Sequence, residues 1–326
     1  MHFIFTTSLL LLCSLCVSAF TNPLKTWDGS DPYMVYSNGY YYLTSTTWTN
    51  IQITRGKTMA ELKTATPKVV WSDSTADRCC GVWAPEIHWM AAQSSWYIYY
   101  TAGNAVNYDG QRLHVLKGSS SDIWASTWSY AGKLTVPNRA DVWSIDATVM
   151  FLASGPHLVY SSFDGPDQCL WIAKMNSPTS LGNAYKISTP TNAWERIGAP
   201  VNEGPAGLYH GGRTWIVYSA SSCGGNGYSL ATLELTGSDP LSAASWKKNN
   251  AGPIFSAANG NNATGHNGFF TAPSGSIYNV YHASPPNDIG CGHNRRTMVQ
   301  AVNWNSDGTP KLGQPRPLSE EIPEPK

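Results

Sequence analysis

Charged residues are scarce in this chain of 326 residues. Asp, Glu, Lys and Arg make up 13% of the sequence, about half the usual ~25% of a soluble domain, and the formal net charge is +0. No basic patch favours nucleic acid as a partner, and no run of like charges indicates a disordered tail or an acidic partner. The sequence therefore favours an uncharged ligand.

Long apolar runs and helical periodicity are also nearly absent. One apolar run extends over residues 3–17 and is followed by the small residues Ser18 and Ala19, a pattern typical of a secretory signal peptide. The run is too short to cross a bilayer comfortably. We predict a signal peptide over residues 1–19, secretion of the rest, and no membrane partner. The weak helical candidate Thr58–Leu62 is predicted to be a tight turn.

Cysteine is infrequent, and two of the seven residues lie in the predicted signal peptide. An oxidising destination favours pairing among the other five, although five cannot all pair. We predict a vicinal Cys79–Cys80 link, a Cys223–Cys291 bridge and a free Cys169. Because spacing does not determine connectivity, the alternative remains that the adjacent pair bonds elsewhere or stays reduced.

Aromatic residues, in contrast, are abundant, with 14 Trp and 17 Tyr. An aromatic-rich strand pattern recurs five times at intervals of 57 to 63 residues, when the copies are aligned on Leu43, Tyr100, Tyr160, Tyr218 and Tyr281. A near-constant period of this length indicates radial repetition of small antiparallel sheets. The sequence predicts an all-β fold, a five-bladed β-propeller, formed as a single domain by residues 20–326.

One polar, mostly ionisable residue stands 12 to 15 residues before each aligned position. These ring positions are Asp31, Glu86, Asp146, Glu203 and His266. The first strand of each blade lines the central channel, so residues at one phase of the repeat meet near the axis. Carboxyls gathered there raise one another's proton affinity, and hydrolysis of a glycosidic bond uses one carboxylic acid and one carboxylate. Structural acids or a metal site are the alternatives.

The local sequences around the ring positions are similar to those of a known family. They are Ser30-Asp31-Pro32-Tyr33, Trp83-Ala84-Pro85-Glu86, Ser144-Ile145-Asp146-Ala147, Asn202-Glu203-Gly204-Pro205 and Gly265-His266-Asn267. With these motifs in order along the chain, the sequence resembles glycoside hydrolase family 43. It looks closest to the exo-acting α-L-arabinofuranosidases that attack α-1,5-linked arabinan, a similarity supported by residues 110–116 and 291–295.

The resemblance implies a role for each of three acids. Asp31 matches the general base, Glu203 the general acid, and Asp146 a third acid that would stay ionised and raise the pKa of Glu203. The implied mechanism is inverting, with the Asp31 and Glu203 carboxyls about 6.5–9.5 Å apart to leave room for water.

The resemblance also implies substrate contacts. Arg295 is expected near the acids, paired with the third acid or a sugar hydroxyl, although the adjacent Arg296 leaves open which arginine points inward. Trp83 and Trp143 are expected to hold a sugar ring against an indole face, with core packing as the alternative. Glu86 is assigned a supporting hydrogen bond rather than catalysis.

For His266, the resemblance implies a place below the substrate, beside a structural calcium or other small cation near the propeller axis. Calcium prefers oxygen ligands, so water would supply most of the coordination. A hydrogen-bonded structural histidine is the alternative. The chemistry itself requires no cofactor.

The expected activity is release of terminal L-arabinofuranose from arabinan or arabino-oligosaccharides by a secreted, monomeric enzyme. β-Xylosidase and endo-arabinanase activities on the same fold are alternatives, as is a sugar-binding propeller without catalysis. Retaining enzymes that act on fructose polymers also use five blades and three acids, but their Trp-Met-Asn-Asp-Pro-like start is missing from this sequence.

Overall fold

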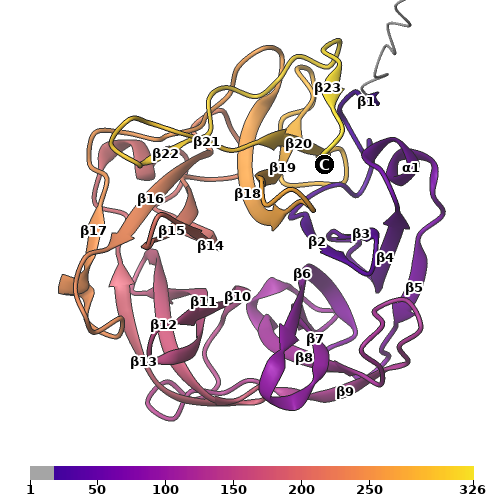
Figure 1. Ribbon diagram of the computed structural model, residues 1–326. Coiled ribbons are helices and arrows are strands. Elements are labelled where there is room, and N and C mark those ends of the chain that lie inside the picture. The colour runs from indigo at the N-terminus through magenta and orange to yellow at the C-terminus, as the bar shows by residue number, and fades with distance from the viewer. Residues whose placement is uncertain (1–17) are drawn as a thin grey trace, which may run out of the picture.

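The computed structural model describes residues 18–326, so all of the predicted signal peptide except Ser18 and Ala19 lies outside the described residues. Five antiparallel sheets stand around a central axis, and Figure 1 looks along this axis. The arrangement is a five-bladed β-propeller, which confirms the predicted fold. Within the described residues, no helix is both long and apolar enough to cross a membrane.

The sheets follow one another along the chain, and each sheet pairs consecutive strands. Blade 1 contains β2 (Tyr33–Ser37), β3 (Tyr40–Thr44), β4 (Ile51–Gly56) and β5 (Lys68–Trp71). Blade 2 contains β6 (Cys80–Met90), β7 (Ser95–Gly103), β8 (Arg112–Gly118) and β9 (Trp128–Lys133). Blade 3 contains β10 (Ile145–Leu152), β11 (Gly155–Asp164), β12 (Asp167–Ser177) and β13 (Ser180–Ser188).

The last two blades complete the ring. Blade 4 contains β14 (Asn202–His210), β15 (Arg213–Ala220), β16 (Ser229–Leu235) and β17 (Trp246–Lys248). Blade 5 contains β18 (Asn262–Thr271), β19 (Ile277–Ser284) and β20 (Arg296–Ala301). Two small pairs lie outside the blades, namely β1 (Ala19–Phe20) with β23 (Ile322–Pro323) and β21 (Asn303–Trp304) with β22 (Pro310–Lys311). The 3-10 helices are η1 (Ala91–Gln93), η2 (Tyr108–Gly110), η3 (Ala193–Glu195) and η4 (Ala243–Ser245).

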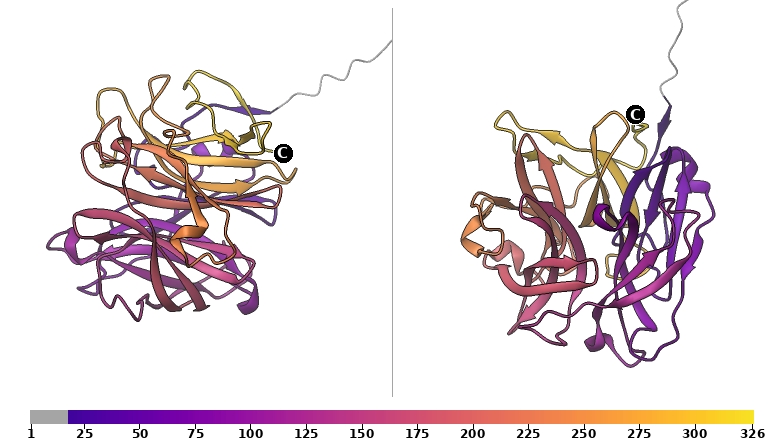
Figure 2. Two further views of the ribbon diagram at one scale, coloured as in Figure 1. Left: turned by 90° about the vertical axis from the view of Figure 1, so that its left-hand side faces the viewer. Right: turned by 60° about the horizontal axis from the view of Figure 1, so that its bottom comes forward.

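The N-terminal segment closes the ring by running along β20 of the last blade. The Leu24 N–H donates to Thr297 O over 2.8 Å, and the Gly29 N–H donates to Arg295 O over 3.0 Å. At the other end of the chain, β23 pairs with β1, so the first described strand lies beside the C-terminal segment (Figures 1 and 2). The closing segment leads directly into Asp31, which therefore starts blade 1 beside residues of blade 5.

The apolar core is divided among the contacts between blades. Each of five buried clusters draws its residues from two neighbouring sheets. Alternation along a strand explains this division, because successive side chains point to opposite faces of a sheet. In β7, for example, Tyr99 packs with blade 3 and the adjacent Tyr100 packs with blade 1. The repeated aromatic pattern thus fills the interfaces that hold the blades in a ring.

The cysteine pairing is the predicted one. Disulfides join Cys79 to Cys80 and Cys223 to Cys291, and Cys169 is free and buried.

The prediction of a tight turn at Thr58–Leu62 was wrong, because residues Met59–Thr64 form the short helix α1. Its N-terminus is well capped: Thr58 Oγ1 accepts from the Glu61 N–H over 3.1 Å. The Glu324 carboxylate, from the far end of the chain, also accepts from the N–H groups of Met59 and Ala60, over 2.7 and 2.9 Å. Donors that a short helix leaves unpaired are satisfied in this way.

Candidate active site

The first strands of four blades are irregular near the axis. Register shifts separate Trp83 from Glu86, Ile145 from Thr148, Glu203 from Ala206, and Gly265 from Gly268. Trp83, Ile145 and Glu203 therefore occupy equivalent positions in three blades. Glu86 lies further along β6, at the position equivalent to Thr148. Such β-bulges redirect side chains and are common next to active sites.

Three of the ring residues have a left-handed backbone, with φ of 51° at Asp31, 58° at Asp146 and 37° at His266. Residues other than glycine rarely adopt this conformation, and such strain clusters at functional sites. Gly204 adopts it directly after Glu203, with φ of 52°, and a Cβ there would come within 2.9 Å of His266 Cγ. Both the backbone conformation and the close approach therefore require glycine at this position.

These local conformations bring the three predicted acids into one pocket of about 120 Å³. It is lined by Asp31, Trp48, Trp83, Ile145, Asp146, Glu203, Cys223, His266, Cys291 and Arg295. Every blade contributes to this lining. The acids come from blades 1, 3 and 4, the indoles of Trp48 and Trp83 from blades 1 and 2, and His266 from blade 5.

Asp31 is held by donors on both carboxylate oxygens. Arg295 Nη1 donates to Oδ1 over 2.9 Å, and Thr46 Oγ1 donates to Oδ2 over 2.6 Å. Burial alone would raise the pKa of Asp31, but the charges of Arg295 and His266 outweigh it and hold the pKa well below its usual range. Asp31 is therefore ionised and able to accept a proton.

Arg295, rather than Arg296, is the arginine that points inward, and it is 5% exposed. Its charged partner is Asp31, not the third acid. The backbone explains this choice, because the Gly29 N–H donates to Arg295 O and so holds the segment before Asp31 against the arginine.

Asp146 and Glu203 have fewer charged partners. The Gly204 N–H donates to Asp146 Oδ2 over 3.1 Å, while Tyr228 Oη and Gln168 Nε2 each donate to Glu203 over 2.9 Å. Burial raises the pKa of Asp146 to about 7, and the charges of Glu203 and Asp31 oppose its ionisation. Burial and the Asp31 charge also raise the pKa of Glu203. At a pH where Asp31 is ionised, the Asp146–Glu203 pair therefore still holds one proton. That proton can be on either carboxyl, so one of the two arrangements is a protonated Glu203 beside an ionised Asp146.

His266 lies between two of the acids. Its Nδ1 is 3.3 Å from Asp31 Oδ1 and 3.8 Å from Asp146 Oδ2. Burial lowers the pKa of His266, but Asp146, Asp31 and Glu203 outweigh it and raise the pKa. The side chain of His266 is thus suited to be a charged imidazolium that offsets the charge of the carboxylates. An imidazolium nitrogen is a donor only, so this arrangement does not fit a cation bound through Nδ1.

A metal site is not apparent elsewhere in the described part of the chain. Residues 18–326 contain no group of three or more His, Cys, Asp or Glu side chains arranged to hold a metal ion. The calcium expected near His266 stays a prediction, and its oxygen ligands would have to come mainly from water.

Aromatic rings form one wall of the pocket. Trp48 and Trp83 meet edge to face with ring centroids 5.7 Å apart, and Tyr108 lies 4.8 Å from Trp83. Indole faces suit the apolar faces of an uncharged sugar. Trp83 is therefore placed where a sugar platform is expected, and Trp48 shares that position.

Two predicted substrate contacts do not line this pocket. Glu86 is buried, with Oε2 2.7 Å from His88 Nε2, because it stands past the bulge of β6, at the position equivalent to Thr148 and not at that of Trp83. Trp143 packs 4.6 Å from Phe163 and donates from Nε1 to Tyr108 O over 2.9 Å. Trp143 thus supports the segment that carries Tyr108.

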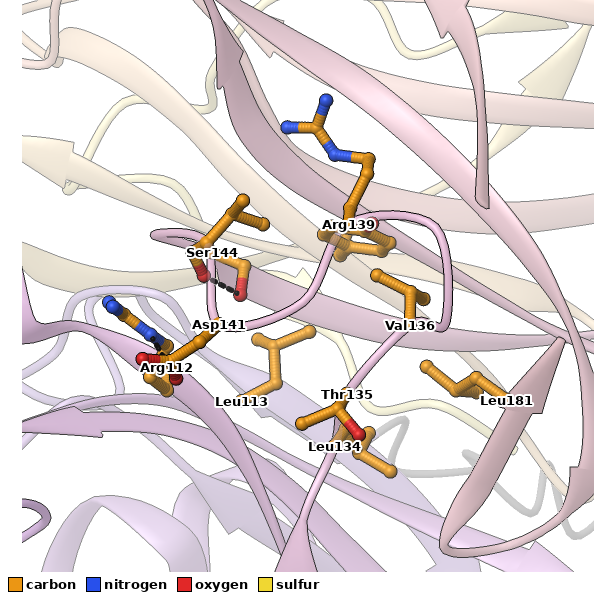
Figure 3. Close-up of a pocket in the computed structure, with 11 residues that line it drawn as sticks. Arg112, Leu113, Leu134, Thr135, Val136, Arg139, Asp141, Ser144 and Leu181 are labelled. Carbon is orange, nitrogen blue, oxygen red and sulfur yellow. Dashed lines mark hydrogen bonds and ion pairs between the residues drawn. The ribbon is translucent and has the colours of Figure 1, made fainter. Parts of the chain in front are cut away.

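Other cavities are separate from the carboxyls. The crevice in Figure 3 is bordered by Arg112, Arg139 and Leu181, and its volume of about 10 Å³ is enough for about one water molecule. A cavity of about 260 Å³ lies further along the first strands and is bordered by Tyr33 and His88 among others. None of the three acids borders either cavity.

A propeller whose blades bring three carboxyls to one pocket, with one ionised and a proton kept on the others, has the fold and site of an acid–base glycosidase. Comparison with known proteins agrees with this class. The model described as "Glycosyl hydrolases family 43" matches residues 20–310, and the chain belongs to this family. The resemblance of its motifs is thereby confirmed.

The chain is similar to several arabinofuranosidases. It is 36% identical over 312 residues to an extracellular exo-α-(1→5)-L-arabinofuranosidase of Streptomyces avermitilis, covering 91% of this chain and 63% of that protein. It is 36% identical over 309 residues to α-L-arabinofuranosidase 43 of Humicola insolens, covering 88% and 62%. The chain thus spans less than two thirds of these relatives. A solved structure of an α-L-arabinofuranosidase from Lactobacillus brevis matches with a TM-score of 0.84 at 30% identity, covering 92% of this chain and 98% of that one.

Proposed function

We propose that this protein is an exo-acting α-L-arabinofuranosidase that releases terminal L-arabinofuranose from α-1,5-linked arabinan or arabino-oligosaccharides. The observation that carries the proposal is that one pocket favours an ionised carboxylate and, beside it, a protonated carboxylic acid. Arg295 favours an ionised Asp31, whereas burial favours a proton on the Asp146–Glu203 pair. The printed names of the relatives support the sugar and the linkage.

In the proposed mechanism, Asp31 accepts a proton from water as the water oxygen bonds to the anomeric carbon. Glu203 donates its proton to the glycosidic oxygen as the bond from that oxygen to the anomeric carbon breaks. Attack and departure occur on opposite faces of the sugar, so the anomeric configuration inverts. Tyr228 and Gln168 orient Glu203, and the charge of an ionised Asp146 raises the proton affinity of Glu203.

The size of the pocket supports exo action. Its volume of about 120 Å³ is well below the ~300–1,000 Å³ of pockets that bind drug-sized ligands. One small sugar ring suits such a space better than the middle of a polymer. The indoles of Trp48 and Trp83 would contact the apolar face of that ring.

The pH dependence of kcat/KM follows from the two opposite pKa shifts. A general base fails when it is protonated, and the lowered pKa of Asp31 places that loss below about pH 4. A general acid fails when it is deprotonated, and the Asp146–Glu203 pair, with Asp146 at about 7, places that loss near neutral pH or above. We expect a plateau in mildly acidic buffer, measured by arabinose release. A decline that begins near pH 5 would contradict the raised pKa values.

The test of the function is product analysis on linear arabinan, arabinoxylan and xylo-oligosaccharides. We expect arabinose as the sole early product from linear arabinan, and NMR during the first turnovers should show the β-anomer that inversion produces. Xylose as the main product would indicate a β-xylosidase, and longer fragments of arabinan an endo-arabinanase. Retention of the α-anomer would exclude the inverting mechanism, and no released sugar would favour a binding propeller.

We further propose that the protein acts outside the cell as a monomer. The apolar run over residues 3–17 and the extracellular relative from Streptomyces avermitilis support secretion. Two disulfides agree with an oxidising compartment. Detection in culture medium and light scattering of the purified protein test the two statements.

A further inference from the structure

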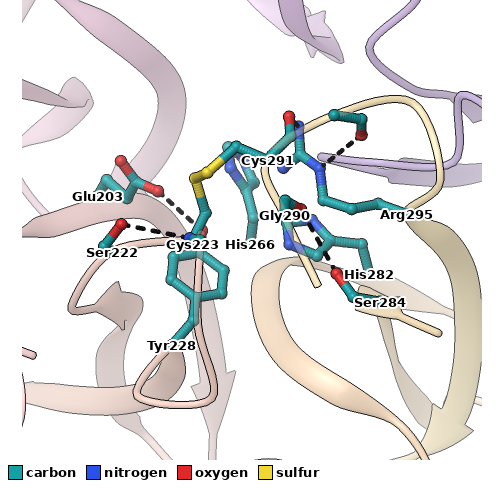
Figure 4. The surroundings of a disulfide bond; sticks show 12 residues. Glu203, Ser222, Cys223, Tyr228, His266, His282, Ser284, Gly290, Cys291 and Arg295 are labelled. Carbon is teal, nitrogen blue, oxygen red and sulfur yellow. Dashed lines mark hydrogen bonds between the residues drawn. A yellow bond between two sulfur atoms is a disulfide. The ribbon is translucent and has the colours of Figure 1, made fainter. Parts of the chain in front are cut away.

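The Cys223–Cys291 disulfide lies in the wall of the carboxyl pocket (Figure 4). Cys223 belongs to the loop over residues 221–228, between β15 and β16 of blade 4. Cys291 belongs to the loop over residues 285–295, between β19 and β20 of blade 5. The bond therefore joins two neighbouring blades at the mouth of the proposed active site.

The loop that contains Cys291 holds the proposed base. Arg295 Nη2 donates to Cys291 O over 2.8 Å, and its Nε donates to Gly292 O over 3.2 Å. The third nitrogen, Nη1, donates to Asp31 over 2.9 Å. The position of the guanidinium at Asp31 thus depends on the backbone around Cys291.

The loop that contains Cys223 holds the proposed acid. Tyr228, at the end of this loop, donates from Oη to Glu203 over 2.9 Å. Its ring stacks on His282 with centroids 5.5 Å apart and an interplanar angle of 3°. His282 Nδ1 in turn lies 3.4 Å from Asp31 Oδ1. One loop therefore contacts the proposed base Asp31 through Arg295, and the other contacts the proposed acid Glu203 through Tyr228.

Both loops contain flexible stretches next to the disulfide. Residues 221–228 include three glycines, and in residues 285–295 the two glycines Gly290 and Gly292 flank Cys291, although Pro285 and Pro286 restrict the start of that loop. Glycine loses the most conformational freedom on ordering, so a loop rich in it depends on external contacts. Across residues 18–326, no hydrogen bond joins these two loops directly, which leaves the disulfide as their covalent link.

We propose that the Cys223–Cys291 disulfide is a positioning element that keeps the general base and the general acid in register across the blade 4–blade 5 boundary. This inference rests on the proposed function. Opening the bond would loosen the Cys291–Gly292 backbone, whose carbonyls accept from the Arg295 guanidinium, and, separately, the backbone that leads to Tyr228. Misplacement of a reacting group by about 1 Å can cost about 100-fold in rate, so a fall in kcat of tenfold or more is expected.

A change in the pH profile would separate positioning from mere stability. The charged and titratable groups that face Asp31 are Arg295, His266, His282, Tyr228, Asp146 and Glu203. If Arg295 moves away, the remaining carboxylates oppose ionisation of Asp31 more strongly, and its pKa rises. The acidic limb of kcat/KM should then move to higher pH.

The experiment uses the double variant Cys79→Ser/Cys80→Ser, in which Cys223–Cys291 is the remaining disulfide. The folded protein is treated with tris(2-carboxyethyl)phosphine, which reduces the bond to two thiols and is itself oxidised to the phosphine oxide with an oxygen from water. Both cysteines are partly exposed, so the reagent can reach them. We measure kcat, KM, the pH profile and circular dichroism before and after reduction. The control adds Cys223→Ser/Cys291→Ser to the same Cys79→Ser/Cys80→Ser background; without a disulfide, it should match the reduced protein and not respond to the phosphine.

The expected result is a folded, reduced protein with kcat lowered at least tenfold and the acidic limb displaced upward. Unchanged kcat in the reduced protein would overturn the proposal. So would a loss of activity with an unchanged pH profile, or a loss of the folded spectrum, because the bond would then serve stability alone. Failure of the untreated protein to release arabinose would instead contradict the proposed function.

Discussion

The variant Asp31→Asn is expected to lose about 10²–10⁴-fold in kcat/KM on every substrate. An amide has nearly the same shape as the carboxylate but cannot accept the proton of the attacking water. The loss should be equal for arabino-oligosaccharides and for aryl arabinofuranosides, because both need the same activated water. Initial rates of arabinose release on the two substrates measure it.

The control for this experiment is Asp164→Asn. Asp164 is exposed at the end of β11, pairs with Lys186 and does not line the pocket, so its loss should leave the rates unchanged. Asp31→Asn also leaves the buried Arg295 without its carboxylate, which weakens folding, so circular dichroism at the assay temperature must show an intact fold. A folded Asp31→Asn protein with near-normal rates would remove Asp31 from the mechanism.

The fold could be predicted from the sequence because every blade has to pack against a neighbouring blade on both faces. A strand that packs against blades on both faces needs large apolar residues at successive positions, as Tyr99 and Tyr100 show. That need recurs with every blade and makes the period visible. The short helix α1 could not be placed equally well, since two of its three capping hydrogen bonds come from Glu324 at the far end of the chain.

The three acids could also be predicted, but not the phase of every ring position. The spacing along the sequence placed Glu86 beside them, whereas the strand register makes Trp83 equivalent to Ile145 and Glu203, and Glu86 equivalent to Thr148. The interval between blades varies by several residues, so a count along the sequence does not resolve a difference of three residues.

Residues that orient the acids were missed for a different reason. Gln168 lies on β12, Tyr228 stands just before β16, and His282 lies on β19, so none belongs to a first strand. Their contacts with the acids depend on how strands pair across a blade and between blades. The sequence offers one weak signal, the glycine-rich segment before Tyr228, which indicates a loop but no contact with Glu203.

The variant Glu203→Gln is expected to show a loss that depends on the leaving group. Glutamine cannot protonate the departing oxygen. In an arabino-oligosaccharide the leaving group is the hydroxyl oxygen of the next sugar, a poor leaving group without a proton, so hydrolysis should fall by about 10²–10⁴-fold. In a nitrophenyl arabinofuranoside the leaving group is a nitrophenolate, which is stable without a proton, so the rate of its hydrolysis should fall far less. The ratio of the two losses is the measurement, and it distinguishes an acid from a base.

The matched control is Glu234→Gln, which lies in the same blade and pairs with Arg213 away from the pocket. This variant should leave the rate of hydrolysis unchanged for both substrates. The Asp31→Asn losses provide the second comparison, since removal of the base should not depend on the leaving group. Equal losses on both substrates for Glu203→Gln would contradict the acid role. The proton would then have to come from Asp146, the other member of the buried pair, and Asp146→Asn would show the dependence on leaving group in its place.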